Sequence, residues 1–169
     1  PDWDGKSSLV ATDNLAGGRL AGEFMAGQLE PGAKVAILEG VLGAPSLDDR
    51  VTGFEEGLGD GFEIVAKLPT DCDQTKGLDA AQDILTANPD LDALYGACGP
   101  PIIGAIEAIA SAGMTISVVG FDAGPDEIAA IIEGTELASV AQFPFKMGEL
   151  GADTAFRAAN GETVPELVD

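Results

Sequence analysis

Arginine, aspartate and glutamine side chains follow short apolar segments of this 169-residue chain. Arginine offers a rigid fork of hydrogen-bond donors, and an aspartate carboxylate accepts hydrogens from two hydroxyl groups. Together with small neutral residues, such side chains suit a neutral, polyhydroxylated ligand better than a phosphate or a hydride carrier. The residues that follow the apolar segments are Asp13 with Asn14, the segment 42–50 ending at Arg50, Asp71, Cys72, Asp73, Cys98, Gly99, Asp122 and Gln142. A sugar is therefore the predicted ligand class.

Each of these residues also has a purely structural explanation. Asp13 can cap the helix that follows it, and Asp122 can be a turn residue after its strand. Arg50 lies near a helix start, where the helix dipole disfavours positive charge, so it needs either a carboxylate or a ligand as its partner. Gln142 precedes Pro144 closely and indicates nothing by itself.

The composition excludes several kinds of chemistry. The sequence has no histidine, and its 8 Lys and Arg against 29 Asp and Glu give a formal net charge of -21. Without histidine, Ser-His-Asp and Cys-His catalytic units and imidazole-bound metals are excluded. The segment that begins at Asp71 lacks the glycine and glutamate of a calcium loop. We expect no enzymatic activity, no cofactor and no metal, and the acidic charge opposes binding to nucleic acid.

Strands and helices alternate along the whole chain and must position these side chains. Strands are predicted near residues 8–12, 34–38, 62–67, 93–95, 116–121 and 137–141. Helices are predicted near 15–28, from 45 to about 58, near 75–87, from 100 to 113, from 125 to 134 and near 145–159. This alternation predicts an α/β fold, a doubly wound parallel sheet with helices on both faces. Ligands of such sheets bind at the carboxyl ends of the strands, where the polar residues occur.

Four sequence strings carry a family resemblance: ATDNLAGGRLAG at 11–22, AKVAILEG at 33–40, DRVTGF at 49–54 and VVGFD at 118–122. Together they resemble the periplasmic sugar-binding proteins of the ribose-binding type, and the resemblance extends from about Ser8 to Glu162. This family of type 1 periplasmic binding proteins supplies the solute receptors of ATP-binding-cassette (ABC) importers. Its members have two flavodoxin-like α/β lobes joined by three crossing segments, with the sugar bound between the lobes.

The resemblance implies that residues 1–169 form a carboxyl-terminal ligand-binding lobe. An amino-terminal lobe and a signal peptide are then expected upstream, and the helix 145–159 is expected to pack on that missing lobe. The expected location is the periplasm, and the expected partners are a small neutral sugar or polyol and the membrane permease of an importer. An isolated lobe is expected to bind sugar weakly and to self-associate.

The resemblance also assigns roles to individual residues. Arg50 resembles the arginine that donates to sugar oxygens, Asp122 the aspartate that accepts sugar hydroxyls, and Gln142 the ligand-contacting glutamine at the hinge. Cys72 stands where ribose-binding relatives have a stacking aromatic, and Cys98 with Gly99 where they have an amide and an acidic residue. We therefore expect a different sugar or polyol from ribose. The expected ligand-binding residues are Arg50, Asp122, Gln142, Cys72, Cys98 and Asp13.

Two further questions stay open at the level of sequence. Cys72 and Cys98 end what should be neighbouring strands, and they form either a disulfide at the cleft floor or two buried thiols. The receptor function also has an alternative, because the effector-binding lobe of a sugar-responsive, LacI-type transcription repressor shares this architecture. The net charge of -21 favours the receptor, since a DNA-binding protein needs positive charge. A flavodoxin-like enzyme is disfavoured, because no nucleophile-base pair or phosphate loop is present.

Overall fold

The computed structural model describes residues 5–168, and the chain divides into two compact units. The sheet unit comprises Asn14–Ala141, and the terminal unit combines Pro1–Asp13 with Gln142–Asp169. The two units are described separately below. Within residues 5–168, no helix combines the length and apolarity needed to cross a lipid bilayer.

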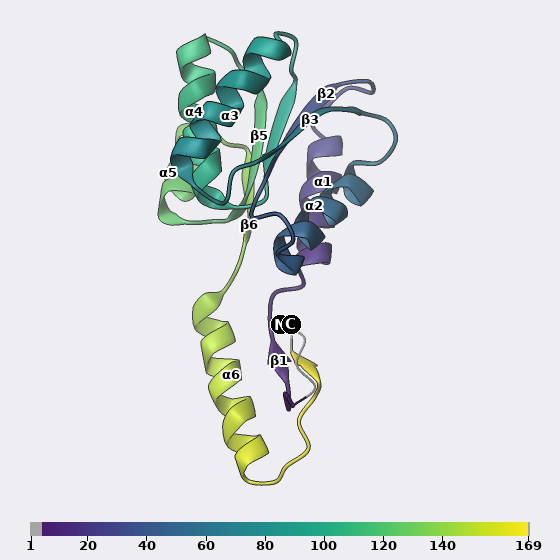
Figure 1. The fold of residues 1–169 in the computed structure, drawn as a ribbon, viewed down its shortest axis with the longest axis vertical. Helices are drawn as coiled ribbons and strands as arrows, with labels where there is room; N and C mark the ends of the chain where they lie inside the picture. The colour runs from purple at the N-terminus through teal and green to yellow at the C-terminus, as the bar shows by residue number, and fades with distance from the viewer. Residues whose placement is uncertain (1–4, 169) are drawn as a thin grey trace. The chain divides into compact units, whose positions relative to one another are not determined.

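The sheet unit contains five parallel strands in the order β3-β2-β4-β5-β6 (Figure 1). The strands are β2 (Lys34–Glu39), β3 (Glu63–Pro69), β4 (Ala93–Gly96), β5 (Ser117–Asp122) and β6 (Ala138–Ala141). The helices are α1 (Asn14–Ala26), α2 (Pro45–Leu58), α3 (Gln74–Ala87), α4 (Gly99–Ala112) and α5 (Pro125–Glu133). From β2 the chain runs outward to β3 on one side and then to β4, β5 and β6 on the other. The strand order therefore reverses between β2 and β4, and the doubly wound α/β fold predicted from the sequence is confirmed.

Helices cover both faces of this sheet (Figure 1). Alternate side chains of β2 point to opposite faces, so Val35 and Ile37 join one core and Ala36 and Leu38 join the other. The first core includes residues of α1 and α2, and the second includes residues of α3 and α4. This two-sided burial explains why the central strand is a continuous apolar run rather than an alternating one.

Helices α1 and α2 pack with their backbones in close approach. A Cβ atom on Gly18 would overlap the carbonyl of Arg50, and one on Gly53 would overlap the carbonyl of Leu15. Only glycine permits this separation, since any larger residue at either position would force the helices apart. The close approach brings the start of α1 beside the first turns of α2, and so places Asn14 next to Arg50.

The terminal unit contains α6 (Pro144–Ala159) and a pair of short parallel strands, β1 (Leu9–Val10) and β7 (Leu167–Val168). The sequence predicted the strand near 8–12 but placed it with the others, whereas β1 pairs with β7 in a separate two-stranded sheet. The strand β7 was not predicted, because a two-residue strand has no periodicity to detect.

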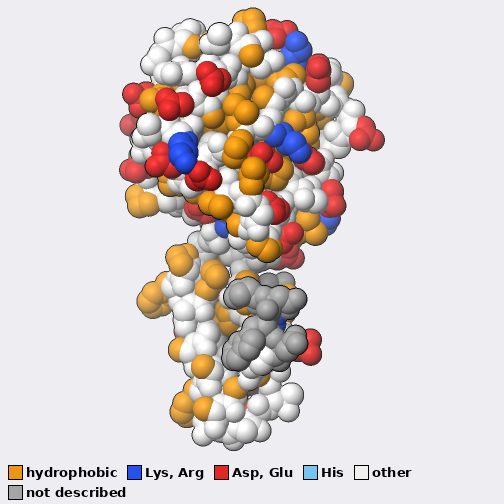
Figure 2. Space-filling view, viewed as in Figure 1, with side chains coloured by type: hydrophobic (Ala, Val, Ile, Leu, Met, Phe, Trp, Pro, Cys, Tyr) orange, Lys and Arg blue, Asp and Glu red, His pale blue; other side chains and the backbone are white. Residues whose placement is uncertain are grey.

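Helix α6 exposes large aromatic side chains. Phe145 and Phe156 are 90% and 69% exposed, and Phe143, directly before the helix, is 70% exposed. Thr154 is the buried residue of the helix. On the face drawn in Figure 2, hydrophobic side chains gather over α6, while charged side chains are concentrated over the sheet unit. An apolar helical surface of this kind is typical of a contact with another protein segment.

Candidate ligand-binding site

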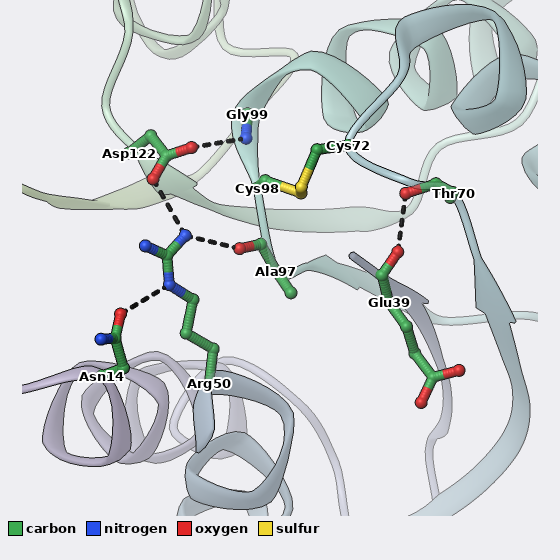
Figure 3. The surroundings of a disulfide bond; sticks show 9 residues. All are labelled: Asn14, Glu39, Arg50, Thr70, Cys72, Ala97, Cys98, Gly99 and Asp122. Atoms are coloured by element: carbon green, nitrogen blue, oxygen red, sulfur yellow. Dashed lines mark hydrogen bonds and ion pairs between the residues drawn. A yellow bond between two sulfur atoms is a disulfide. The ribbon is translucent and has the colours of Figure 1, made fainter. Parts of the chain in front are cut away.

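The candidate site lies at the carboxyl ends of β2, β4 and β5, where the strand order of the sheet unit reverses. Figure 3 shows Asn14 and Arg50 rising from α1 and α2 toward Asp122 at the end of β5 and toward the segment 97–99. This edge of a doubly wound sheet is where side chains from separate strands and helices converge, so it is the natural place for a ligand.

Arg50 is the centre of the site and is only 6% exposed. Its Nε–H donates to Oδ1 of Asn14 at 2.8 Å, and its Nη1 donates to the carbonyl of Ala97 at 2.8 Å and to Oδ1 of Asp122 at 3.0 Å. The guanidinium also lies over the ring of Phe121, 3.9 Å from its centroid. Contacts on its face and along two nitrogens hold the side chain in one orientation. The two hydrogens on Nη2 are not used by these bonds.

Asp122 is the second member of the site, and its side chain is 32% exposed. One carboxylate oxygen accepts from Arg50, and the other accepts from the backbone N–H of Gly99 at 3.3 Å. Asp122 and the following Ala123 have φ values of 102° and 49°, a region that side-chain-bearing residues rarely occupy. Unusual backbone conformations of this kind are concentrated at functional sites.

The charges of Arg50 and Asp122 balance each other, so the pair itself is neutral. A buried guanidinium alone would favour an anionic ligand, but here Asp122 balances its charge at 3.0 Å. Tyr95 lies beneath the site, stacked on Phe54 with ring centroids 4.0 Å apart, and burial raises the pKa of its hydroxyl. A neutral tyrosine adds no charge, so the arrangement suits a ligand that offers hydroxyl groups rather than a formal charge.

Cys72 and Cys98 form a disulfide bond with their Cα atoms 5.8 Å apart (Figure 3). This decides between the two alternatives that the sequence left open. The bond joins the turn after β3 to the residue before α4, and that turn holds Asp71 and Cys72 at φ values of 51° and 55°. Cys98 sits between Ala97 and Gly99, which contact Arg50 and Asp122 respectively. The disulfide therefore anchors the residue between the two backbone groups that contact Arg50 and Asp122.

A pocket of about 250 Å³ opens beside this arrangement. Asp122 and Gly99 line it, together with residues at the starts of α3, α4 and α5: Gln74, Pro100, Ile103, Gly124, Pro125, Asp126 and Glu127. Three helix amino-termini thus line the same space. Pro100 and Pro125 carry no N–H, and the N–H groups of Gly99 and Gly124 donate to Asp122 and Glu127, so polar side chains rather than helix-end N–H groups would contact a ligand there.

The structure brings four of the six predicted site residues together within the sheet unit. Arg50 contacts Asp122, and Cys72 is bonded to Cys98. Gln142 and Asp13 belong to the terminal unit, where Oε1 of Gln142 accepts from the hydroxyl of Thr12 at 2.8 Å. Within residues 5–168, no group of three or more His, Cys, Asp or Glu side chains is arranged to hold a metal ion.

The six expected ligand-binding residues do not include Asn14 or Phe121, which both contact Arg50. Asn14 adjoins Asp13 and was noted among the strand-end residues, but it is Asn14 that contacts Arg50 within the sheet unit. Phe121 directly precedes Asp122 and was included only as part of its strand, because its position under the guanidinium depends on tertiary structure. The sequence signal for both residues is their position next to an expected site residue: Asn14 follows Asp13, and Phe121 precedes Asp122.

Comparisons with known proteins agree with this architecture. The model of the periplasmic binding protein domain matches residues 4–163. Ribose import binding protein RbsB of Bacillus subtilis (strain 168) is 38% identical over 161 residues, covering 95% of this chain and 53% of that protein. RbsB of Escherichia coli (strain K12) is 37% identical over 159 residues, covering 93% and 54%. The chain therefore spans about half the length of the curated relatives it matches.

A solved structure shows the same likeness in three dimensions. GanP, a glucose-galactose binding protein from Geobacillus stearothermophilus, superposes with a TM-score of 0.93 at 30% identity, covering 98% of this chain and 60% of that one. These relatives are named as binding proteins rather than as enzymes or repressors, in line with the binding role expected from the sequence. The chain belongs to the periplasmic binding protein domain family.

Proposed function

We propose that this chain is one lobe of a periplasmic receptor that delivers a neutral sugar or polyol to an ABC importer. The observation that carries the proposal is the Arg50–Asp122 pair, which is held at the switch point of the sheet by Asn14, Ala97 and Gly99. It combines fixed donors and fixed acceptors without net charge, and this is the chemistry that a ring of hydroxyl groups needs.

The pair leaves specific atoms for the ligand. The Nη2 hydrogens of Arg50 can donate to a sugar oxygen, and the partly exposed carboxylate of Asp122 can accept from a hydroxyl. On the strength of the family resemblance, Gln142 is proposed as a further ligand contact, and a second lobe is proposed to close over the sugar. Asp13 is assigned a smaller part, as a polar residue beside Asn14 at the start of α1.

The disulfide distinguishes the proposed ligand from ribose. Cys72 and Cys98 stand at positions where the ribose-binding type is expected to have a stacking aromatic and an amide, and here they are bonded to each other. A disulfide offers neither an aromatic face nor an amide hydrogen bond, and each hydrogen bond to a ligand contributes about 0.5–1.5 kcal/mol. We therefore favour another sugar or polyol, with fewer hydroxyl groups to satisfy on that side.

Helix α6 supports the proposal that a second lobe belongs to the working protein. Its exposed aromatic residues Phe145 and Phe156 form an apolar surface, and a groove of about 510 Å³ lies between it and the β1 segment. Small residues such as Gly151, Ala155 and Ala158 line that groove. We propose that the amino-terminal lobe covers this surface, and that the isolated chain self-associates through it.

The charge and the disulfide support a receptor over a repressor. A net charge of -21 repels DNA phosphates, and a disulfide forms and persists in an oxidising compartment such as the periplasm. The proposed partner is the membrane permease of the importer, and no partner nucleic acid is proposed.

Isothermal titration calorimetry tests this function directly. A panel of pentoses, hexoses and polyols is titrated into the complete two-lobed protein and into the 169-residue chain. We expect micromolar binding or better of at least one neutral compound by the two-lobed protein, and binding at least about tenfold weaker by the single lobe, which supplies only part of the cage. Arg50→Leu should abolish binding, whereas Lys67→Leu, at an exposed ion pair with Glu55, serves as the control and should not. The absence of any sugar or polyol ligand for the complete protein would refute the proposal.

A further inference from the structure

The turn that presents Asp122 is held by a partly buried hydrogen-bond network around the buried Glu127, which the site described above does not include. Directly after Asp122, the N–H of Ala123 donates to the hydroxyl of Ser139 at 3.0 Å. The next N–H, of Gly124, donates to Oε2 of Glu127 at 2.9 Å. Ser139 in turn donates to Oε1 of Glu127 at 2.8 Å. One carboxylate therefore holds two consecutive backbone groups of the turn, one directly and one through a hydroxyl.

Glu127 occupies a space that two glycines leave for it. The residue is only 2% exposed, although it lies in the first turn of α5. A Cβ atom on Gly120 would lie 2.5 Å from Oε1 of Glu127, and one on Gly99 would overlap Oε2. Gly99 is also the residue whose N–H donates to Asp122. The Glu127 carboxylate therefore lies between the backbone at Gly99 and the backbone at Gly120, and both segments help to orient the Asp122 side chain.

A second buried acid lies against the first. Glu136 is 2% exposed, and neither of its carboxylate oxygens has a hydrogen-bond partner within the described chain. A Cβ atom built on Gly120 would lie 2.6 Å from Oε1 of Glu136 and 2.5 Å from Oε1 of Glu127. Both carboxylates therefore border the space beside Gly120. Burial raises the pKa of both carboxyl groups, and each is further affected by a neighbouring acid, Glu136 by Glu127 and Glu127 by Asp122. Because Glu127 accepts two hydrogen bonds and Glu136 accepts none, Glu127 is the better placed of the two to carry the negative charge.

We propose that Glu127, acting through Gly124 and Ser139, is a positioning residue that fixes the carboxylate of Asp122 in its ligand-binding orientation. The proposal rests on the proposed sugar-binding function, in which Asp122 contacts the ligand. Asp122 and Ala123 have φ values of 102° and 49°, so the turn would relax toward ordinary conformations if its N–H groups lost their acceptors. Relaxation would move the Asp122 carboxylate away from Arg50 and from Gly99.

A simpler role for Glu127 is helix capping. Its bond to the Gly124 N–H has the geometry of half a capping box at the start of α5, and this alone would stabilise the helix without affecting a ligand. The link to Ser139 and Ala123, and the contact with Gly99, go beyond a cap because they connect α5 to β6 and to the start of α4. The experiment must therefore separate ligand affinity from helix stability.

The test compares Glu127→Ala, Glu127→Gln and the control Glu133→Ala in the complete two-lobed protein. Glutamine retains an oxygen for the Gly124 N–H and an amide for Ser139, so it should keep the turn in place. Glu133 lies in the same helix but is exposed, so its loss removes an acid of α5 without touching the network. Affinity is measured by calorimetry with the tightest-binding compound of the sugar and polyol panel. Amide hydrogen exchange of Ala123 and Gly124 is measured without ligand.

We expect Glu127→Ala to weaken binding about tenfold or more, the effect of losing one ligand hydrogen bond, and to speed exchange at both amides. Glu127→Gln should bind within about threefold of wild type, and Glu133→Ala should be unchanged. Wild-type affinity in Glu127→Ala would overturn the inference, as would failure of the glutamine to rescue a loss. If Glu127→Ala does not fold, Ser139→Ala removes only the hydroxyl link, and unaltered affinity there overturns the inference equally.

The proposed function and the positioning role fail in distinguishable ways. If the wild-type protein binds no compound of the panel, the sugar-binding function is refuted. The exchange measurement then still decides whether Glu127 holds the turn, because it needs no ligand, and unchanged protection of Ala123 and Gly124 in Glu127→Ala would refute that role independently.

Discussion

Removing the Cys72–Cys98 disulfide is expected to destabilise the sheet unit by an amount that can be calculated from the sequence separation of the two cysteines. The bond closes a loop between residues separated by 26 positions. The loss of loop-closure entropy in the unfolded chain then corresponds to about 3.5 kcal/mol at 25 °C. For a chain of this size, such a change lowers the melting temperature by about 7–14 °C.

The assay is thermal unfolding followed by circular dichroism, with and without dithiothreitol. The perturbed protein carries Cys72→Ser and Cys98→Ala; alanine is chosen for the second position because Cys98 is only 3% exposed and a buried hydroxyl there would add its own cost. Reduction should lower the melting temperature of the wild type toward that of the double variant and should leave the variant unchanged. Thiol titration of the unfolded, unreduced wild type should find no reactive thiol.

Two results would refute the reasoning. Two reactive thiols in the unreduced protein would mean that the bond is not formed. If full reduction lowers the melting temperature by less than about 3 °C, the unfolded chain gains little freedom when the bond is broken, contrary to the loop-closure argument. The double variant is the control for both, because any effect of dithiothreitol on it cannot come from this bond.

Three further expectations concern single residues. Arg50→Leu should cost about 2–4 kcal/mol in urea unfolding, because it leaves Asp122 without its partner in a largely buried pair; a cost near zero would contradict the assigned contacts. Burial and Glu127 raise the pKa of Glu136 from 4.5 to about 8, so the folded state binds the proton more tightly and this group should lower the free energy of unfolding as the pH rises between those values, by at most about 1.4 kcal/mol per pH unit. Glu136→Gln should remove that contribution, and an unchanged pH slope in urea unfolding would contradict it. Gly18→Ala should cost about 1–3 kcal/mol through overlap with α2, whereas Gly148→Ala, with open space around it in α6, should be neutral or stabilising.

Much of the fold could be predicted from local signals because proline marks helix starts in this chain. Pro45, Pro125 and Pro144 each occupy the first position of a helix, and Pro100 the second position of α4. Proline cannot continue a preceding helix and has the backbone angle of a new one, so such boundaries are readable without tertiary information. The separate pairing of β1 with β7 could not be predicted, because strands of two residues have no pattern of their own.

Residues of the candidate site could be predicted from the sequence, but the contacts between them could not. Ligands of parallel sheets bind at the carboxyl ends of the strands, and this expectation selects Arg50 and Asp122, because both follow apolar segments that end at the same edge of the sheet. Their 3.0 Å ion pair joins residues 72 positions apart, and it depends on the strand order and on the close packing of α1 with α2. No local pattern encodes either, so the choice between an ion pair and a ligand contact for Arg50 required the structure.

In helix α5, hydrophobic patterning predicts the wrong exposure for several side chains. Its sequence offers isoleucines for burial and acids for the surface, yet Ile128 and Ile132 are 49% and 81% exposed while Glu127 is 2% exposed. The reason is specific bonding, because a carboxylate that accepts from Gly124 and Ser139 can replace an apolar contact. A buried acid of this kind is visible only when its partners are placed in space.

The unusual backbone of the sheet unit is concentrated at the proposed site and is held there by two independent devices. Among residues 5–168, the non-glycine residues with positive φ are Asp71, Cys72, Asp122 and Ala123. Each such conformation costs about 1–3 kcal/mol and persists only when its surroundings enforce it. The disulfide restrains the first pair, and the Glu127 network restrains the second. Because both turns carry residues of the proposed site, ligand affinity should depend on the disulfide and on the Glu127 network together.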